Sequence, residues 1–153
     1  MRRKERECSD PTFFTTMLTS SAVMTLAFQA EDFPYVIPVN FAFLNNALYV
    51  HSATEGRKLD CLKANPNVGF SIHELLGIDR EKATTLYTCL YGEGRARVIL
   101  DDEEKQTALA ALAEKYQSRC PRPVPDAMLK KTAVLRIDIV SLSGKRHLPE
   151  SDR

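Results

Sequence analysis

The stretch that decides the fold is YVHSATEGRKLDCLKANP, residues 49–66. Its first residues alternate like the end of a strand, and its later residues have the composition of a short helix that Pro66 would end. Ser52 and Glu55 match the S-x-x-E capping box, which predicts that a helix begins at Ser52 and runs from about Thr54 to Asn65. The stretch therefore indicates a strand that turns directly into a helix.

Two cations, Arg57 and Lys58, follow this corner and fall within the first two turns of the predicted helix. The free N–H groups and the dipole at a helix N-terminus favour an anion and slightly disfavour cations, unless an anion lies between them. Arginine offers a planar fork for phosphate and lysine adds a point charge, so with the Ser52 hydroxyl these groups would hold a phosphate monoester. A capped surface helix with two solvated cations explains the same residues, and local physics leaves both interpretations open.

The segment YVIPVNFAFL (35–44) is predicted to be a strand, and Asn45-Asn46 to be the hairpin turn that pairs it with 47–52. Pro38 lies inside this strand, and because proline cannot donate a hydrogen bond to the ladder, it marks an edge or a bulge. An open edge presents backbone N–H and C=O groups that a flat heteroaromatic ring can use. A plain sheet edge without a ligand also explains Pro38, and this strand by itself favours that interpretation.

Other β-rich segments complete the predicted sheet. They are residues 22–29, 67–74, 83–100 and 132–142, with a loop at 75–82. Strand follows strand through short turns more often than through helices, which favours an antiparallel sheet or barrel over a doubly wound parallel sheet. The predicted fold is therefore mainly β with flanking helices, built on about six antiparallel strands.

Two further helices are predicted from their caps. Asp10 and Pro11 indicate the start of a helix that continues to about Ser20. Asp101 and Glu104 form a capping-box pattern before a longer helix. One face of that helix carries apolar residues at helical spacing, which are Leu109, Leu112, Ala113 and Tyr116.

The chain has 153 residues and a formal net charge of +1. This length suits one domain, 1–153, in which about 1–10 and 145–153 are predicted to be frayed. The balanced charge argues against nucleic acid or an anionic membrane as a partner, and no apolar run is long enough to cross a bilayer. No secretory signal is expected either, since the charged start leads into no apolar segment. Reduced thiols in a cytoplasmic protein are expected, because no C-x-x-C pair occurs among Cys8, Cys61, Cys89 and Cys120.

Several catalytic motifs are incomplete. HELLG (73–77) begins like the metalloprotease motif H-E-x-x-H, but Gly77 stands where the second histidine is required. The glycines of GEG (92–94) are followed by Arg97 at the third glycine position of a dinucleotide fingerprint. The three histidines are too few for a convincing metal cluster, so no metal site is predicted. If the chain is an enzyme, a bound organic cofactor is expected to supply the reactivity.

Five blocks of the sequence occur in an order that resembles one family. They are MRRKERE (1–7), PYVIPVNF (34–41), LYVHSATEGRKLD (48–60), NPNV (65–68) and GEGRARV (92–98). They resemble the flavin-binding split-barrel proteins related to pyridoxamine 5′-phosphate oxidase, and among these the nitroimidazole-reductase (Nim) branch. The similarity runs from about Met1 to Lys145. It implies a six-stranded antiparallel split barrel with Greek-key connections, FMN as the cofactor, and a homodimer with FMN at the subunit interface.

The resemblance also implies which residues bind the cofactor. The strand whose backbone meets the isoalloxazine ring is matched by Ile37, Pro38, Val39 and Asn40. The pair at the end of the next strand is matched by His51 and Ser52, and the cations on the FMN phosphate are matched by Arg57 and Lys58. Cys89 lies where relatives place a small polar residue near the pyrimidine edge of the flavin, with Thr88 as the alternative one residue away. A buried small residue without contact to flavin is the alternative for Cys89.

The expected activity is that of an FMN-dependent oxidoreductase. It would pass electrons from a reduced donor such as NAD(P)H to a small acceptor such as a nitro compound. His51 is the expected catalytic proton donor, because imidazole titrates near neutral pH, and a purely structural role is its alternative. Oxidation of vitamin B6 is not predicted, because the tail SLSGKRHLPESDR (141–153) lacks a clear match to the aromatic and arginine residues of the oxidase.

Two other functions remain open on the same barrel. One is a non-catalytic flavin carrier, store or redox sensor. The other is a split barrel that binds haem or a deazaflavin, for which His51 or His73 would be available as an axial haem ligand.

Overall fold

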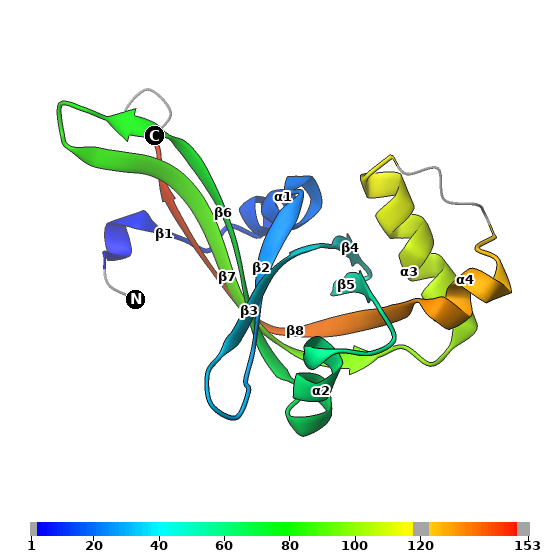
Figure 1. The fold of residues 1–153 in the computed structure, drawn as a ribbon. Helices are drawn as coiled ribbons and strands as arrows, with labels where there is room; N and C mark the ends of the chain where they lie inside the picture. The colour runs from blue at the N-terminus through cyan, green and yellow to red at the C-terminus, as the bar shows by residue number, and fades with distance from the viewer. Residues whose placement is uncertain (1–2, 118–122, 150–153) are drawn as a thin grey trace.

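One curved antiparallel sheet organises the molecule, and helices flank it (Figure 1). The structure, a computed structural model, describes residues 3–117 and 123–149. The strands follow the order β3-β2-β6-β7-β8-β5-β4, and β1 pairs with β8 beyond the end of β5. The mainly β, antiparallel fold with flanking helices that the sequence predicts is therefore confirmed.

The strands and helices have the following bounds. The strands are β1 (Glu7–Cys8), β2 (Val23–Phe28), β3 (Tyr35–Asn40), β4 (Ala42–Leu44), β5 (Ala47–Ser52), β6 (Asn67–Asp79), β7 (Thr84–Val98) and β8 (Ala133–His147). The helices are the 3₁₀ turn η1 (Lys4–Arg6), α1 (Pro11–Ser20), α2 (Arg57–Ala64), α3 (Asp102–Lys115) and α4 (Asp126–Lys131). In this part of the chain, no helix has both the length and the apolar character that a membrane span requires.

The strand count is a correction, because the sheet has eight strands and six are predicted. The predicted strand 35–44 is divided into β3 and β4 at Phe41, whose N–H donates to the Tyr116 hydroxyl at 2.9 Å instead of to a neighbouring strand. The two residues of β1 are too few for a periodic pattern to predict. The hairpin turn at Asn45 and Asn46 is confirmed, and both residues have positive φ, as a tight two-residue turn requires.

β6 and β7 form a long hairpin that extends away from the helices α2, α3 and α4 (Figure 1). The predicted loop at 75–82 is wrong in its first half, because β6 continues to Asp79 and the turn lies at 80–83. β8 follows the hairpin as far as His147, whose Nδ1 lies 2.7 Å from the Thr85 carbonyl oxygen. The predicted fraying is therefore wrong for 145–147, which belong to the sheet, as do Glu7 and Cys8 of β1 at the other end.

The core lies against the concave side of the sheet and reaches under two helices. In β2 the buried side chains alternate, at Met24, Leu26 and Phe28, as a strand with one covered face requires. They belong to a cluster that includes Leu18 of α1 and Leu59 of α2. The apolar faces of these short helices thus hold them on the barrel and fix where α2 begins.

The predicted caps of α1 and α3 are present. Asp10 accepts a hydrogen bond from the Thr12 N–H at 2.8 Å, and Asp101 accepts one from the Glu104 N–H at 2.7 Å. Only half of the second capping box forms, because the Glu104 side chain turns to two arginines of the sheet instead of back to the Asp101 N–H. The cap therefore also fastens α3 to the strands.

Candidate functional site

The helix α2 begins at Arg57, so Arg57 and Lys58 occupy its first turn. The predicted start at Ser52 is wrong, because Ser52 still belongs to β5, where it pairs with Ala133 of β8. Gly56 is the N-cap, with φ 120° and ψ 169°, a backbone conformation that is essentially restricted to glycine. The two cations therefore lie nearer the helix N-terminus than the sequence predicts.

The N-terminus of α2 has backbone donors to offer. The Gly56 carbonyl accepts hydrogen bonds from the N–H groups of Leu59 and Asp60, at 2.8 and 3.2 Å. The N–H groups of the residues before Leu59 have no intrahelical acceptor, and no side chain caps this helix. Such a terminus favours an anionic ligand, through its free donors and its dipole.

The Arg57 guanidinium lies over an aromatic pair. The rings of Phe28 and Tyr35 stack with centroids 5.8 Å apart, and the Arg57 Cζ lies 4.9 Å from the Tyr35 centroid. Tyr35 is the first residue of β3, so this cation–π contact holds the guanidinium beside the start of that strand. A guanidinium that contacts a ring through its face keeps its N–H donors free at the edge.

Lys58 is half-buried, and burial lowers the pKa of its ammonium group below the usual value. Within residues 3–117 and 123–149, its side chain has no hydrogen bond or ion pair. Lys63, at the other end of α2, is exposed and forms an ion pair with Asp60 at 3.3 Å. A desolvated, unpaired ammonium is unfavourable by itself, and a bound anion would remove that penalty.

β3 is the edge strand that Pro38 predicts. Within the described sheet, β3 forms a ladder with β2 alone, and Pro38 lies opposite Thr25. Val39 is buried and Ile37 half-buried, whereas Pro38 and Asn40 are exposed. The free side of β3 therefore offers backbone N–H and C=O groups between the start of α2 and the end of β5.

His51 and Ser52 end β5, where they pair with Val134 and Ala133 of β8. The His51 side chain is exposed, and across the described part of the chain it has no hydrogen-bond partner. Ser52 is half-buried at the point where the chain leaves the sheet for α2. The end of β5 thus leads directly to α2, and the contact of Arg57 with Tyr35 joins α2 to the start of β3.

Asn40 and His51 line one pocket between the β3–β5 side of the sheet and the helices α3 and α4, with a volume of about 400 Å³. We call it the helical pocket. Its other lining residues are Leu109, Leu112, Ala113, Tyr116, Val124, Met128 and Thr132. The predicted apolar face is present, and its residues on α3 and the C-cap Tyr116 form a wall of this pocket.

Cys89 does not join these residues within one chain. It is buried on β7, where it pairs with His73 of β6 and Lys145 of β8. His51 pairs with β8 at Val134, 11 residues from Lys145, which is about 36 Å along an extended strand. Thr88, the alternative, is its neighbour and has a buried hydroxyl without a hydrogen-bond partner in the described structure.

Three features of the site escape a sequence-based prediction. Tyr35 supports Arg57 through a ring contact that has no local sequence pattern. The helix α4 was not predicted, because its six residues are too few for a periodic pattern. Gln106 holds the loop before α4, since its side chain donates to the Val124 carbonyl and accepts from the Val124 N–H, each at 2.7 Å.

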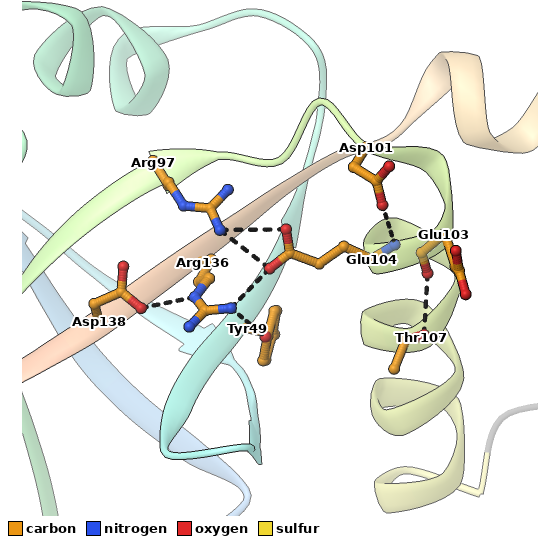
Figure 2. Close-up of polar contacts among 8 residues, drawn as sticks. All are labelled: Tyr49, Arg97, Asp101, Glu103, Glu104, Thr107, Arg136 and Asp138. Carbon is orange, nitrogen blue, oxygen red and sulfur yellow. Dashed lines mark hydrogen bonds and ion pairs between the residues drawn. The ribbon is translucent and has the colours of Figure 1, made fainter.

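A second group of charged and polar side chains, which includes two arginines, lies where β7, β8 and α3 meet (Figure 2). We call it the arginine cluster; it consists of Arg97, Arg136, Glu104, Asp138 and Tyr49. Glu104 accepts from Arg97 at 3.2 Å and from Arg136 at 3.0 Å, and Arg136 also donates to Asp138 at 2.7 Å and to the Tyr49 hydroxyl at 3.3 Å. These hydrogen bonds, above all the one from Arg136, lower the pKa of Glu104. The cluster fastens α3 to the sheet and leaves its cations paired.

Other candidate chemistry is sparse. In the part of the chain that the structure describes, no group of three or more His, Cys, Asp and Glu side chains is arranged to hold a metal ion. Cys8, Cys61 and Cys89 are buried free thiols, and Cys120 lies outside the described residues. The basic start of α2 and the helical pocket therefore carry the functional argument.

The family comparison agrees with this architecture. A model of the family described as pyridoxamine 5′-phosphate oxidase matches residues 14–146. The chain belongs to this family. The family prediction from the sequence is thus confirmed, and the match runs from within α1 through β2 almost to the end of β8, with α2, α3 and α4 included.

Solved structures of similar fold come from several bacteria. A candidate 5-nitroimidazole antibiotic resistance protein of Bacteroides thetaiotaomicron is 24% identical, with a TM-score of 0.79 over 91% of this chain and 85% of that one. The flavocytochrome Anf3 of Azotobacter vinelandii is 19% identical, with a TM-score of 0.85 over 97% and 72%. An FAD-binding protein of Mesorhizobium loti is 23% identical, with a TM-score of 0.70 over 93% and 97%. At these identities the similarity establishes the shared fold.

A relative is also found by sequence. An uncharacterised protein of Rhizobium meliloti is 34% identical over 68 residues, which is 44% of this chain and 44% of that protein. The aligned part thus spans less than half of either chain, and it adds no activity to the family assignment.

Proposed function

We propose that this chain is an FMN-binding flavoprotein and that the start of α2 anchors the FMN phosphate. The observation that carries the proposal is Lys58, a half-buried ammonium with no carboxylate partner in the described structure, beside Arg57 at a helix N-terminus. A phosphate dianion fits this donor set, because it neutralises both cations and accepts from the free N–H groups of the first turn. These residues therefore fit the phosphate of FMN, and the family comparisons support a flavin.

The ring of the flavin is proposed to lie along the free side of β3. Ile37, Pro38, Val39 and Asn40 supply backbone groups there, and β3 begins at Tyr35, which supports Arg57. A phosphate at α2 and a ring at β3 are thereby held by adjoining elements. Fixed backbone dipoles orient such a ring and tune its electronic properties.

His51 is proposed to hold the proton that the reaction needs, at the end of β5 next to Ser52. Its imidazole is exposed and has no hydrogen-bond partner among the described residues, so it is free to donate to a bound molecule. When bound, the flavin supplies the redox chemistry, because its ring alternates between an oxidised and a reduced form. The chain's own contribution is to bind and orient the reactants and to exclude water.

The proposed reaction transfers electrons from a reduced donor, such as NAD(P)H, to a small acceptor, such as a nitro compound. The nitroimidazole resistance protein that shares this fold supports the choice of acceptor, and the FAD-binding relative supports a flavin. The buried free thiols at Cys8, Cys61 and Cys89 are in keeping with a reducing, cytoplasmic location.

We further propose a homodimer with the flavin at its interface. The outer face of β2, β6, β7 and β8 carries two hollows of about 430 and 510 Å³, lined by small and polar residues, beside the exposed Tyr91 and Val140. A second subunit could cover this face. Cys89, which is far from His51 along β8, would reach a flavin only as Cys89 of the partner subunit.

One experiment tests the flavoprotein and its rivals together. The purified protein is titrated with FMN, its visible spectrum is recorded, and its mass in solution is measured by light scattering. We expect a flavin spectrum, saturable binding with one FMN per chain, and a dimer. A Soret band in place of the flavin band would identify haem instead, a rival that the exposed His51 and the related flavocytochrome favour.

The enzyme is separated from a carrier or sensor by two half-reactions. The FMN-loaded protein is mixed anaerobically with NADH or NADPH, and the reduced protein is then mixed with a nitroimidazole. We expect the flavin absorbance to bleach in the first step and to return in the second. A protein that binds FMN but fails in both steps is a carrier or sensor.

A further inference from the structure

The helical pocket differs in chemistry from the start of α2. Among the described residues, its lining contains no Asp, Glu, Lys or Arg. Leu109, Leu112 and Val124 give it apolar walls, and Met128 lies at its rim with 45% of its surface exposed. A charged ligand would lose its hydration there without gaining a counter-charge, so the pocket favours a neutral molecule.

Two polar side chains are free at the strand end of the pocket. Asn40 comes from β3 and His51 from β5, and within residues 3–117 and 123–149 neither side chain has a hydrogen-bond partner. The Tyr116 hydroxyl, by contrast, is already used, because it accepts from the Phe41 N–H and lies 2.6 Å from the Ala22 carbonyl oxygen. At the strand end, the amide of Asn40 and the imidazole of His51 can therefore donate to an oxygen of a ligand, and the hydroxyl of Thr132, which precedes β8, is a further donor in the lining.

The walls of the pocket are held in place. Gln106 of α3 makes two hydrogen bonds to the backbone of Val124, and Lys105 donates to the Leu129 carbonyl of α4. These contacts fasten α4 and Val124, two residues before it, to α3, and the arginine cluster fastens α3 to the sheet (Figure 2). The pocket is thus a preformed cavity, as ligand sites usually are.

We propose that the helical pocket binds the electron acceptor, and that this acceptor is a neutral, flat, mostly apolar molecule with a nitro or carbonyl oxygen directed at Asn40 and His51. β3 carries Asn40 and is also the strand proposed to meet the flavin ring, so a molecule in the pocket lies beside the ring. The identification of this ligand as the electron acceptor rests on the proposed flavoprotein. The binding of a neutral ring compound in this pocket does not rest on the proposed flavoprotein.

The test uses two probes that differ in charge and share a nitrophenyl ring, 4-nitrobenzamide and 4-nitrobenzoate. Each is titrated calorimetrically into the flavin-free and the FMN-loaded protein. The neutral amide is expected to bind at least tenfold more tightly than the carboxylate in both the flavin-free and the FMN-loaded form. Equal binding of the two probes, or no binding of the amide to either form, would overturn the proposal.

Met128→Trp is the variant that blocks the pocket, since position 128 is at the rim and a larger side chain need not enter the core. Leu100→Trp is its control, because Leu100 is 90% exposed between β7 and α3 and does not line this pocket. We expect Met128→Trp to weaken binding of the amide at least tenfold and Leu100→Trp to leave it unchanged. His51→Ala removes one hydrogen bond and is expected to weaken the amide about three- to tenfold.

FMN affinity, measured on the same variants, separates this inference from the flavoprotein. If Met128→Trp binds FMN as the wild type does but no longer binds 4-nitrobenzamide, the result supports a separate acceptor pocket. Loss of FMN together with the amide would overturn the inference, since the pocket would then hold the flavin itself. If the wild type binds the amide in this pocket but never FMN, the flavoprotein fails and the binding site for a neutral ligand stands.

Discussion

Two pairs of basic residues in this chain have opposite electrostatic surroundings. Arg97 and Arg136 share Glu104, and Arg136 has Asp138 in addition (Figure 2). Arg57 and Lys58 have an aromatic ring and a helix N-terminus beside them, and no carboxylate partner in the described structure. The first pair is neutralised inside the protein, whereas the second pair is left to be neutralised by something else.

The difference indicates which cations serve stability and which serve binding. A paired guanidinium that loses its carboxylate leaves a desolvated charge, so the arginine cluster contributes to folding. An unpaired, half-buried ammonium costs folding free energy, which a protein tolerates where a ligand restores it. The predictions below separate these roles, since each variant should change one property and leave the other.

The largest effect is expected at Arg57. Arg57→Ala should weaken the binding of FMN by about 2–5 kcal/mol, roughly 30-fold to several-thousand-fold in affinity, because the phosphate then lacks its bidentate partner. The affinity is measured by fluorescence titration of the flavin. Lys63→Ala is the control on the same helix, where the cation is exposed and paired with Asp60, and it should bind FMN as the wild type does. Equal losses in the two variants would mean that general charge, not this corner, attracts the flavin.

The next effect concerns the turn that places both cations. Gly56→Ala should destabilise the protein by about 1–3 kcal/mol, because the backbone of an alanine is strained at φ 120°. It should also weaken the binding of FMN, because the start of the helix must shift. Gly77→Ala is the matched control, since Gly77 has negative φ and open space around its Cα. Chemical denaturation and flavin titration of both variants check the prediction. A Gly56→Ala protein as stable as Gly77→Ala would contradict it.

The arginine cluster should respond in the opposite way. Glu104→Gln is expected to lower the free energy of unfolding by about 1 kcal/mol, since the part-buried Arg136 and the more exposed Arg97 lose their shared charge, and to leave FMN affinity unchanged. Lys58→Met should keep the stability of the flavin-free protein and lose FMN affinity. A Glu104→Gln variant with reduced FMN affinity and an unchanged free energy of unfolding would contradict these separate roles.

The smallest effects are those of pH. Because Arg136 and Arg97 lower the pKa of Glu104, its contribution to stability is present above the unfolded carboxyl pKa and is lost as pH falls through the lower folded pKa.

Lys58 has a lowered pKa in the flavin-free protein, so its ammonium loses its proton earlier than an exposed lysine as pH rises. FMN affinity should therefore decrease on the alkaline side below the usual lysine pKa of 10.5, and Lys58→Met should remove that decrease. Titrations at a series of pH values check both statements.

The pattern of strands was predictable because it rests on local residue types. The β-rich composition of 22–29 and the Asn45-Asn46 turn predicted the correct elements, and Pro38 correctly marked an edge. The division of 35–44 at Phe41 was not predictable, since it depends on Tyr116, 75 residues away in the sequence. Long-range hydrogen bonds of this kind leave no local pattern.

The start of α2 shows a local rule overridden by tertiary structure. Ser52 and Glu55 satisfy the capping box, but β8 holds Ser52 in the sheet, and the chain turns at Gly56 instead. Arg57 and Lys58 nevertheless lie within the first two turns of α2, as the sequence predicts. Their lack of a carboxylate partner could not be predicted, because it depends on which side chains the fold brings near them.

The most direct test of the central claim compares FMN with riboflavin, which lacks the phosphate. The wild type should bind FMN at least about 100-fold more tightly than riboflavin, a difference of about 2.7 kcal/mol. The double variant Arg57→Ala, Lys58→Met should bind both flavins with the weak affinity that riboflavin has for the wild type. A wild type that binds the two flavins equally, or a double variant that keeps the full preference for FMN, would contradict the account.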